Sequence, residues 1–193
     1  MRKIILASGS PRRKELLKQI GLSFEADASN YKEDMSLDMA PGKLAEFLSA
    51  GKAKEVALRH PDAIVIAADT FIALGREILG KPKSQEDAKL RLRSLSGKTH
   101  AVITGFTIID TKSGKEVSKF VETKVHFRRI SDGEIDAYLA LENVMDKAGA
   151  YAIQGLAALF ITKIEGDYFN IMGLPLPTLG AELKKFGVDV LGK

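Results

Sequence analysis

The chain has 193 residues, of which 45% are apolar and 28% are charged, a composition that fits one folded domain over residues 1–193 and excludes wholesale disorder. It contains no cysteine, which excludes disulfides, thiolate metal sites and a cysteine nucleophile. Its net charge of +4 is compatible with a nucleic acid partner, with a polyanionic small molecule or with a lysine-rich surface, and does not decide among them.

The N-terminal segment predicts a strand followed by a helix. Residues 3–7 form a short and mostly apolar run, as in a buried strand. The run is too short for a signal peptide or a membrane span, so we expect a cytoplasmic protein with no membrane partner. Ser10 is predicted to cap a helix that starts at Pro11 and ends at Gly21.

The next segments predict the centre of a sheet and a long helix. Residues 22–26 are expected to form a second strand, and residues 41–59 carry apolar side chains at helical spacing. Residues 63–68, with the sequence AIVIAA, are the clearest buried strand of the chain. The backbone is expected to continue extended over residues 71–74 and to turn at Gly75.

The second half of the chain alternates between helical and strand patterns. A helix is predicted from a Ser84 cap to about Leu95, followed by strands over residues 99–109 and 116–127. A second helix is capped by Ser131 with Glu134 and runs to about Leu141. A hairpin of strands over residues 157–164 and 168–171 and a last helix from Pro175 to about Phe186 complete the chain. The fold class is therefore α/β, with a mixed twisted sheet flanked by helices. The long hairpins argue against a purely parallel sheet.

The segment between the first strand and the first helix has the features of an anion site. A helix start presents free backbone N–H groups and the positive end of the helix dipole. Ser8 adds a hydroxyl, and Arg12 and Arg13 add planar forks suited to phosphate oxygens. An ordinary capped helix with two exposed arginines would show the same pattern, so the residues alone leave both readings open.

Several single polar residues are candidates whose ordinary structural reading is at least as common. Asp69 follows the best predicted strand, where α/β sheets place ligands, but a lone aspartate there more often caps a turn. Lys52 and Lys81 can each reach a phosphate or lie on the surface. Gln154, in the small-residue segment 146–155, has both a donor and an acceptor for a base edge, although an exposed connector would also carry it. The three histidines show no metal-ligand spacing.

Six segments taken together resemble the Maf family of nucleotide pyrophosphatases, once described as septum-formation inhibitors. They are LASGSPRRKELL at residues 6–17, AADT at 67–70, GKP at 80–82, LSGKTH at 95–100, DKAGAYAIQG at 146–155 and GLPL at 173–176. Each is weak alone, but the ordered set covers nearly the whole chain. The resemblance implies an elongated mixed sheet flanked by helices, with two lobes around a nucleotide-binding cleft.

The resemblance also implies a reaction and its residues. The expected reaction is hydrolysis of a nucleoside triphosphate between the α- and β-phosphates, with Mg²⁺ or Mn²⁺ as the cofactor. Asp69 matches the catalytic acid and would share the metal with Glu33, whose surroundings, Tyr31-Lys32-Glu33, depart from the family's usual hydrophobic-Asp-Glu. Residues matching substrate-binding positions are Ser8, Arg12, Arg13, Lys52, Thr70, Lys81 and Gln154, among which Arg12, Thr70 and Gln154 are linked to substrate choice.

Two positions indicate the branch of the family. Thr70 and the Ile153-Gln154-Gly155 segment resemble the branch that prefers dTTP and UTP, whereas a branch acting on 7-methyl-GTP resembles Asp-Gln and Ser-Glu-Gly there. A pyrophosphatase for non-standard purine triphosphates and a nucleic-acid-binding regulator of cell division stay open as alternatives. The sequence has no basic run or aromatic RNA-binding signature, so we expect no nucleic acid partner. It does not give the oligomeric state and leaves a homodimer open.

Overall fold

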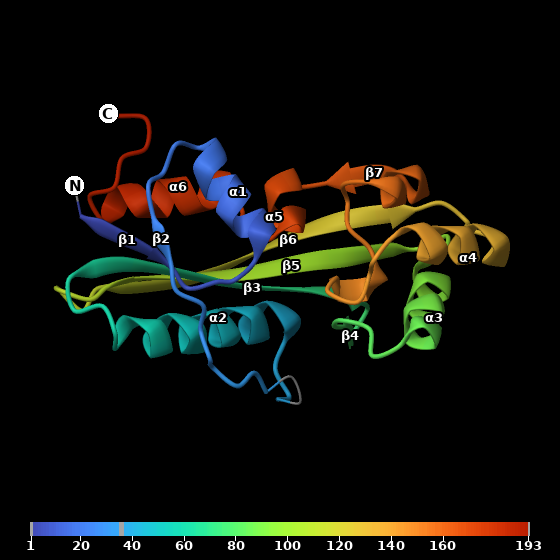
Figure 1. Cartoon of the computed structure of the whole chain (residues 1–193), viewed down its shortest axis with the longest axis horizontal. Coiled ribbons are helices and arrows are strands. Elements are labelled where there is room, and N and C mark those ends of the chain that lie inside the picture. Colours follow the sequence, from blue (N-terminus) through green and yellow to red (C-terminus); the bar gives the residue numbers. More distant parts are fainter. Residues whose placement is uncertain (1, 35–36, 193) are drawn as a thin grey trace.

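A seven-stranded mixed sheet runs along the long axis of the molecule, with helices on both of its faces (Figure 1). The computed structural model describes residues 2–34 and 37–192. The strand order is β2-β1-β3-β5-β6-β7, and β4 also pairs with β3. The strands are β1 (Lys3–Leu6), β2 (Glu25–Ala26), β3 (Ala63–Leu74), β4 (Glu77–Leu79), β5 (Thr99–Asp110), β6 (Glu116–Phe127) and β7 (Ile161–Glu165). β1 pairs in parallel with β2 and β3, and the remaining pairs are antiparallel, which confirms the predicted mixed sheet.

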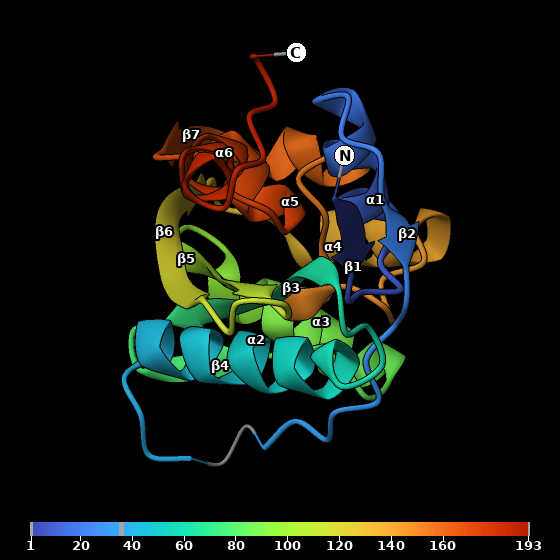
Figure 2. The same cartoon turned by 90° about the vertical axis from the view of Figure 1, so that its left-hand side faces the viewer.

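The helices lie on opposite faces of this sheet. Helix α2 covers one face, and α1, α5 and α6 cover the other (Figure 2). The helices are α1 (Pro11–Gln19), α2 (Pro41–Ala57), α3 (Gln85–Leu95), α4 (Asp132–Leu141), α5 (Tyr168–Met172) and α6 (Leu176–Lys185), with short 3₁₀ turns η1 (Ala148–Ala150) and η2 (Leu156–Phe160). None of the described helices is long and apolar enough to cross a membrane.

The core divides into two lobes that share the three long strands. At one end, α1 and α6 pack on β1, β3 and β5 around Leu16, Leu17, Leu179 and Leu183. At the other end, α3 and α4 pack on β5 and β6 around Leu92, Leu95, Ile135 and Tyr138. Because β5 and β6 are each 12 residues long, one sheet supports both ends, which gives the elongated shape seen in Figure 1.

Close packing of α2 on the sheet depends on Gly105. A Cβ atom at this position of β5 would lie 2.1 Å from the backbone oxygen of Ala45, so any larger residue would push the helix away.

Side-chain caps begin helices α3 and α4, as predicted. The Ser84 hydroxyl accepts the N–H of Asp87 at 3.2 Å, and Ser131 forms a full capping box with Glu134.

Five predictions about local structure are wrong or incomplete. Of the strand expected over residues 22–26, only Glu25–Ala26 forms β2. Residues 168–171 form helix α5 rather than a strand, because the Asp167 carboxylate caps the N–H groups of Phe169 and Asn170 at 2.8 and 3.3 Å. Residues 157–160 belong to a 3₁₀ turn, so only residues 161–164 of the predicted strand lie in β7, which extends to Glu165 and pairs with β6. Ser10 occupies the N-cap position of α1 but makes no side-chain cap hydrogen bond. Strand β4 was not predicted, because its three residues are too few for a period.

Candidate active site

The candidate residues gather where one edge of β3 has no neighbouring strand. β5 pairs with one edge of β3 from Ile64 to Ala73. On the other edge, β1 pairs with residues 63–66 and β4 pairs with residues 72–74. Residues 67–71, which include Asp69 and Thr70, therefore have no ladder partner on that edge among the described residues.

Four of the motif segments meet at this open edge. Residues 7–13 follow β1 on one side of it, and residues 80–82 follow β4 on the other. The segment 146–155 joins them there, since the N–H of Gly149 donates to the carbonyl of Gly80 at 3.0 Å. Segments that are far apart in the sequence thus surround residues 67–70.

The open edge allows one ligand to reach both faces of the sheet. Asp69 and Thr70 are neighbours on a strand, so their side chains point to opposite faces. Asp69 meets Lys52 of α2, whereas Thr70 meets Arg13 of α1. A single ligand can approach both side chains only along a strand edge that no other strand occupies, and residues 67–71 provide one.

Arg13 is held in a fixed orientation by three acceptors. Its Nε donates to the Gly173 carbonyl at 3.0 Å, Nη1 to the Ser8 hydroxyl at 3.2 Å and Nη2 to the Thr70 hydroxyl at 3.0 Å. A guanidinium has five N–H donors, so two stay available for a ligand. Burial lowers the pKa of Arg13, and the charge of Asp69 opposes this shift. The group still carries its charge at physiological pH.

Gly173 is the residue that lets Arg13 come this close. Its φ is +113°, a region that side chains with a Cβ atom rarely adopt. A Cβ atom there would also lie 3.3 Å from the Arg13 Nε. The GLPL segment therefore contributes backbone rather than side chains to the site.

Lys52 joins two carboxylates on the α2 face of the edge. Its Nζ lies 2.5 Å from Asp69 Oδ1 and 2.7 Å from Glu33 Oε1. Asp69 is buried, while the Glu33 side chain is 42% exposed and so lies at the solvent side of the cluster. Two of the predicted acids and one predicted lysine thus form one ion cluster.

Glu33 reaches this cluster because the extended segment of residues 27–33 lies alongside α2. Two extended residues span about 6.6 Å and four helical residues span about 6 Å, so alternate residues of one meet successive turns of the other. Asp27 contacts Arg59 just after the helix, Ser29 contacts Glu55 and Tyr31 packs at Gly51, in steps of four helical residues. Glu33 departs from this step and pairs with Lys52, on the same turn as Gly51. The loop that carries Glu33 is therefore fixed on the helix that carries Lys52.

Three predicted residues lie nearby without fixed partners. Within the described part of the chain, no hydrogen bond or ion pair holds the side chains of Arg12, Lys81 or Gln154, and Lys81 and Gln154 are exposed. The Lys147 hydrogen bond chiefly lowers the pKa of Asp146, and the charge of Arg12 adds to this shift. Arg12 is therefore close enough to act electrostatically on Asp146 of the segment that carries Gln154.

Sequence reasoning missed Thr104 and Asn170. Thr70 and Thr104 share a hydrogen bond of 2.9 Å, and Thr104 donates to the Asn170 carbonyl at 2.9 Å. Both Thr104 and Asn170 are fully buried. No local pattern identifies a threonine in the middle of a strand, and Asn170 was placed in a strand rather than a helix.

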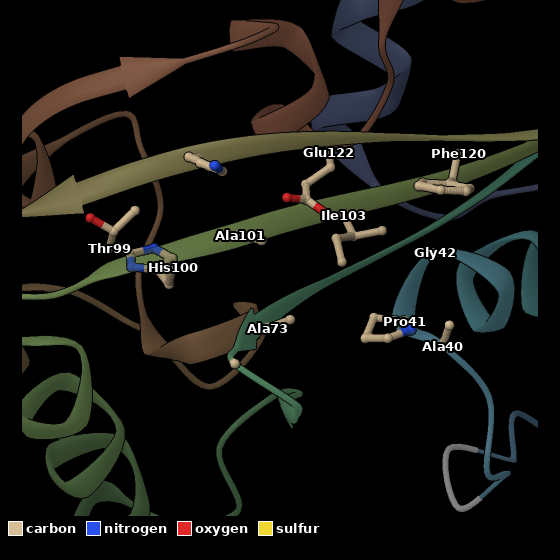
Figure 3. Close-up of a pocket in the computed structure, with 12 residues that line it drawn as sticks. Ala40, Pro41, Gly42, Ala73, Thr99, His100, Ala101, Ile103, Phe120 and Glu122 are labelled. Carbon is tan, nitrogen blue, oxygen red and sulfur yellow. The ribbon is translucent and has the colours of Figure 1, made fainter.

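A hollow of about 470 Å³ lies on the α2 face of the sheet, between α2 and the end of the molecule that carries α3 (Figure 3). It is lined by residues of β5 and β6 such as Ile103, Phe120 and Glu122, with Pro41 at the start of α2. None of the predicted site residues lines it. Among the described residues that line it, Lys124 is the only lysine or arginine, which is little positive charge for a polyanion such as a triphosphate.

The amino-acid sequence matches a known protein family over nearly its whole length. Residues 3–186 match the family model described as Maf-like protein. The chain belongs to the Maf-like protein family. The resemblance inferred from the six segments is thereby confirmed.

Two relatives of this Maf-like chain match it almost end to end. The dTTP/UTP pyrophosphatase of Methanosarcina barkeri (strain Fusaro / DSM 804) is 50% identical over 191 residues, which cover 98% of this chain and 97% of the relative. The dTTP/UTP pyrophosphatase of Alkaliphilus oremlandii (strain OhILAs) is 47% identical over 193 residues, which cover 99% and 100%. Among solved structures, the Staphylococcus aureus Ham1 protein matches with a TM-score of 0.47 and 13% identity, over 65% of this chain and 72% of that chain.

Proposed function

We propose that this Maf-like chain acts as one domain that hydrolyses dTTP and UTP to the nucleoside monophosphate and pyrophosphate. The observation that carries the proposal is the open edge of β3, where Arg13 contacts Thr70 on one face of the sheet and Lys52 contacts Asp69 on the other. Two relatives near 50% identity and named for this activity support the choice of substrate.

The cations and hydroxyls around the edge suit a triphosphate. Phosphoryl-group transfer depends mainly on positioning and on neutralising charge. Arg13 offers its two remaining N–H groups, and the half-buried Arg12 and the exposed Lys81 are free to turn toward a bound phosphate. The Ser8 hydroxyl accepts from Arg13 and from the N–H of Ser10, so its own hydrogen is left to donate to a phosphate oxygen.

Asp69 and Glu33 fit a divalent cation that arrives with the nucleotide. The described residues contain no group of three or more His, Cys, Asp or Glu side chains that could hold a metal, but these two carboxylates converge on the Lys52 ammonium. Mg²⁺ commonly takes one or two carboxylates and completes its shell with phosphate oxygens and water. Bound there, the metal would polarise the phosphate and lower the pKa of a water molecule.

The position of Asp69 suits a residue that holds and orients a ligand. Its buried carboxylate lies 2.5 Å from the Lys52 ammonium, which fixes the direction in which its oxygens point. We therefore assign Asp69 to metal binding and to orientation of the attacking water. That water adds to phosphorus as the bridging oxygen between the α- and β-phosphates leaves with pyrophosphate.

Gln154 is the candidate for reading the base. Uracil and thymine share the O2, N3–H and O4 pattern, and one amide can donate to a carbonyl and accept from N3–H. The side chain is exposed and forms no hydrogen bond with any residue that the structure describes, so it is free to make these bonds. Thr70 is short and leaves room beside Asp69 for the substrate.

A panel of nucleoside triphosphates, assayed with Mg²⁺ or Mn²⁺ for released pyrophosphate, tests the proposal. We expect dTTP and UTP to be hydrolysed best and activity to vanish in EDTA. Preferred hydrolysis of 7-methyl-GTP or of non-standard purine triphosphates would replace the proposal with one of the alternatives.

The absence of nucleic acid binding stays a prediction. Binding to duplex DNA or RNA near physiological salt checks it, and we expect a Kd no tighter than about 10⁻⁶ M. The homodimer also stays open.

A further inference from the structure

Arg13 belongs to a closed ring of hydrogen bonds that contains the buried residue Thr104. The ring runs from Arg13 Nη2 to Thr70 Oγ1 (3.0 Å), to Thr104 Oγ1 (2.9 Å), to the Asn170 carbonyl (2.9 Å), to the Gly173 N–H (3.0 Å), and from the Gly173 carbonyl back to Arg13 Nε (3.0 Å). Nη2 and Nε of Arg13 are therefore both linked to the Asn170 carbonyl. Nη2 is linked through Thr70 and Thr104, and Nε is linked through Gly173.

The direction of each hydrogen in the ring is determined. A carbonyl can only accept, so the single hydroxyl hydrogen of Thr104 goes to Asn170. The hydrogen between the two threonines must then come from Thr70. Thr70 thus donates to Thr104 and accepts from Arg13, which leaves its hydroxyl hydrogen unavailable to a nucleotide.

We propose that Thr104 is a positioning residue for the phosphate-binding fork of Arg13. Its hydroxyl fixes the rotation of the Thr70 hydroxyl, so that a lone pair of Thr70 always faces Arg13 Nη2. Without it, the Thr70 hydrogen can turn toward other acceptors and Arg13 loses one of its three supports. This proposal rests on the proposed function, because it takes Arg13 to bind the triphosphate.

Thr107 provides a matched control on the same strand. It is as fully buried as Thr104, and its hydroxyl also makes two hydrogen bonds, to Ser49 at 2.9 Å and to Ser118 at 2.8 Å. Those bonds do not lead to Arg13. Replacing either threonine with valine removes one buried hydroxyl group from β5, so a general effect on packing would appear in both variants.

The first test compares Thr104→Val, Thr104→Ser and Thr107→Val by thermal unfolding and by steady-state kinetics with UTP. We expect Thr104→Val to lower kcat/KM by about 5- to 20-fold, the range of one to two lost hydrogen bonds. Thr104→Ser should stay within about twofold of the wild type, because it keeps the hydroxyl. Thr107→Val should lose comparable stability with little change in kcat/KM. Equal kinetic losses in the two valine variants would overturn the proposal.

The second test asks whether Thr104 acts through Arg13. In a double-mutant cycle, Thr104→Val should have almost no further effect on kcat/KM once Arg13→Ala is present. Full additivity, with Arg13→Ala itself strongly impaired, would overturn the positioning role and leave the proposed function intact. If Arg13→Ala has wild-type kcat/KM, the phosphate-binding role of Arg13 fails, and the proposal for Thr104 fails with it.

Discussion

The ammonium nitrogen of Lys52 lies 2.5 Å from Oδ1 of Asp69, and the two side chains are only 13% and 10% exposed. Lys52 therefore occupies the place next to Asp69 that a divalent cation would take. The same nitrogen lies 2.7 Å from Glu33, so one lysine neutralises both carboxylates proposed to hold the metal. In the protein without nucleotide, metal and lysine would compete for the same ligands.

This competition predicts the effect of Lys52→Met on metal binding. Without nucleotide, the variant should bind Mn²⁺ about tenfold more tightly than the wild type or better, because a nearby positive charge has been removed. Electron paramagnetic resonance of free Mn²⁺ measures this without turnover. The control is Lys43→Met, which removes the same charge from the same helix, 2.7 Å from Glu46. Equal Mn²⁺ affinity in the Lys52 variant and the wild type would argue against a metal between Asp69 and Glu33.

Asp69→Asn should lower turnover by at least roughly 10²-fold, which corresponds to about 2.7 kcal/mol of activation barrier. The substitution keeps the size of the side chain and removes the charge that holds metal and water. Asp110→Asn serves as the control, since Asp110 is also buried and paired, with Arg2 at 2.5 and 2.6 Å, but lies outside the site. A folded Asp69→Asn protein with turnover close to that of the wild type would remove Asp69 from the mechanism.

Gln154 should distinguish uracil and thymine from cytosine. Cytosine presents an unprotonated N3 and an amino group, so the same amide would have to flip. Once a bound base covers the Gln154 amide, a mismatched polar pair costs about 1–3 kcal/mol. We therefore expect the wild type to prefer UTP over CTP by roughly 5- to 150-fold in kcat/KM. The methyl group of thymine is rejected only weakly, so dTTP should be used as well.

The variant Gln154→Glu should lower kcat/KM for UTP and dTTP more than for other triphosphates. Adding Thr70→Gln should bring some activity on 7-methyl-GTP. Gln85→Glu is a control for the added negative charge, because Gln85 is exposed at the start of α3. Equal use of CTP and UTP by the wild type, or an unchanged substrate profile in Gln154→Glu, would contradict a base-reading role.

His100 should make the protein less stable in mild acid. Burial lowers its pKa from 6.5 to about 4, and its Nε2 shares a 2.7 Å hydrogen bond with the Tyr151 hydroxyl. Between these pKa values the unfolded chain binds a proton that the folded protein does not. The free energy of unfolding should therefore fall as the pH drops from about 6.5 to about 4, by on the order of 3 kcal/mol.

Urea unfolding at several pH values, compared between the wild type and His100→Gln, measures this contribution. The variant cannot titrate at this position, so its stability should fall less over the same interval. The lowered pKa of Asp27, about 2 because of hydrogen bonds with Arg59 and His60, acts in a separate interval below pH 4. Parallel stability curves for the two proteins above pH 4 would show that His100 does not contribute.

Local sequence signals predicted most of the elements but not all of their pairings. The strand from Ala63 to Leu74, the β5–β6 hairpin and the caps of α3 and α4 all follow from residues that are close together in the chain. Helix α5 was missed because its apolar residues also fit a strand, and the deciding cap from Asp167 is a single side chain. Short segments carry too few residues for a period to be recognised.

The sequence by itself determined the family, the α/β class and the candidate residues Ser8, Arg12, Arg13, Glu33, Lys52, Asp69, Thr70, Lys81 and Gln154. Only the tertiary structure decided that Asp69 and Thr70 lie at a gap between β1 and β4. It also decided that Thr104 and the backbone of Asn170 and Gly173 support Arg13. The reason is physical: strand pairing and hydrogen bonds between residues far apart in the chain, up to 160 positions for Arg13 and Gly173, depend on where the whole chain packs, and no local pattern of residue types encodes them.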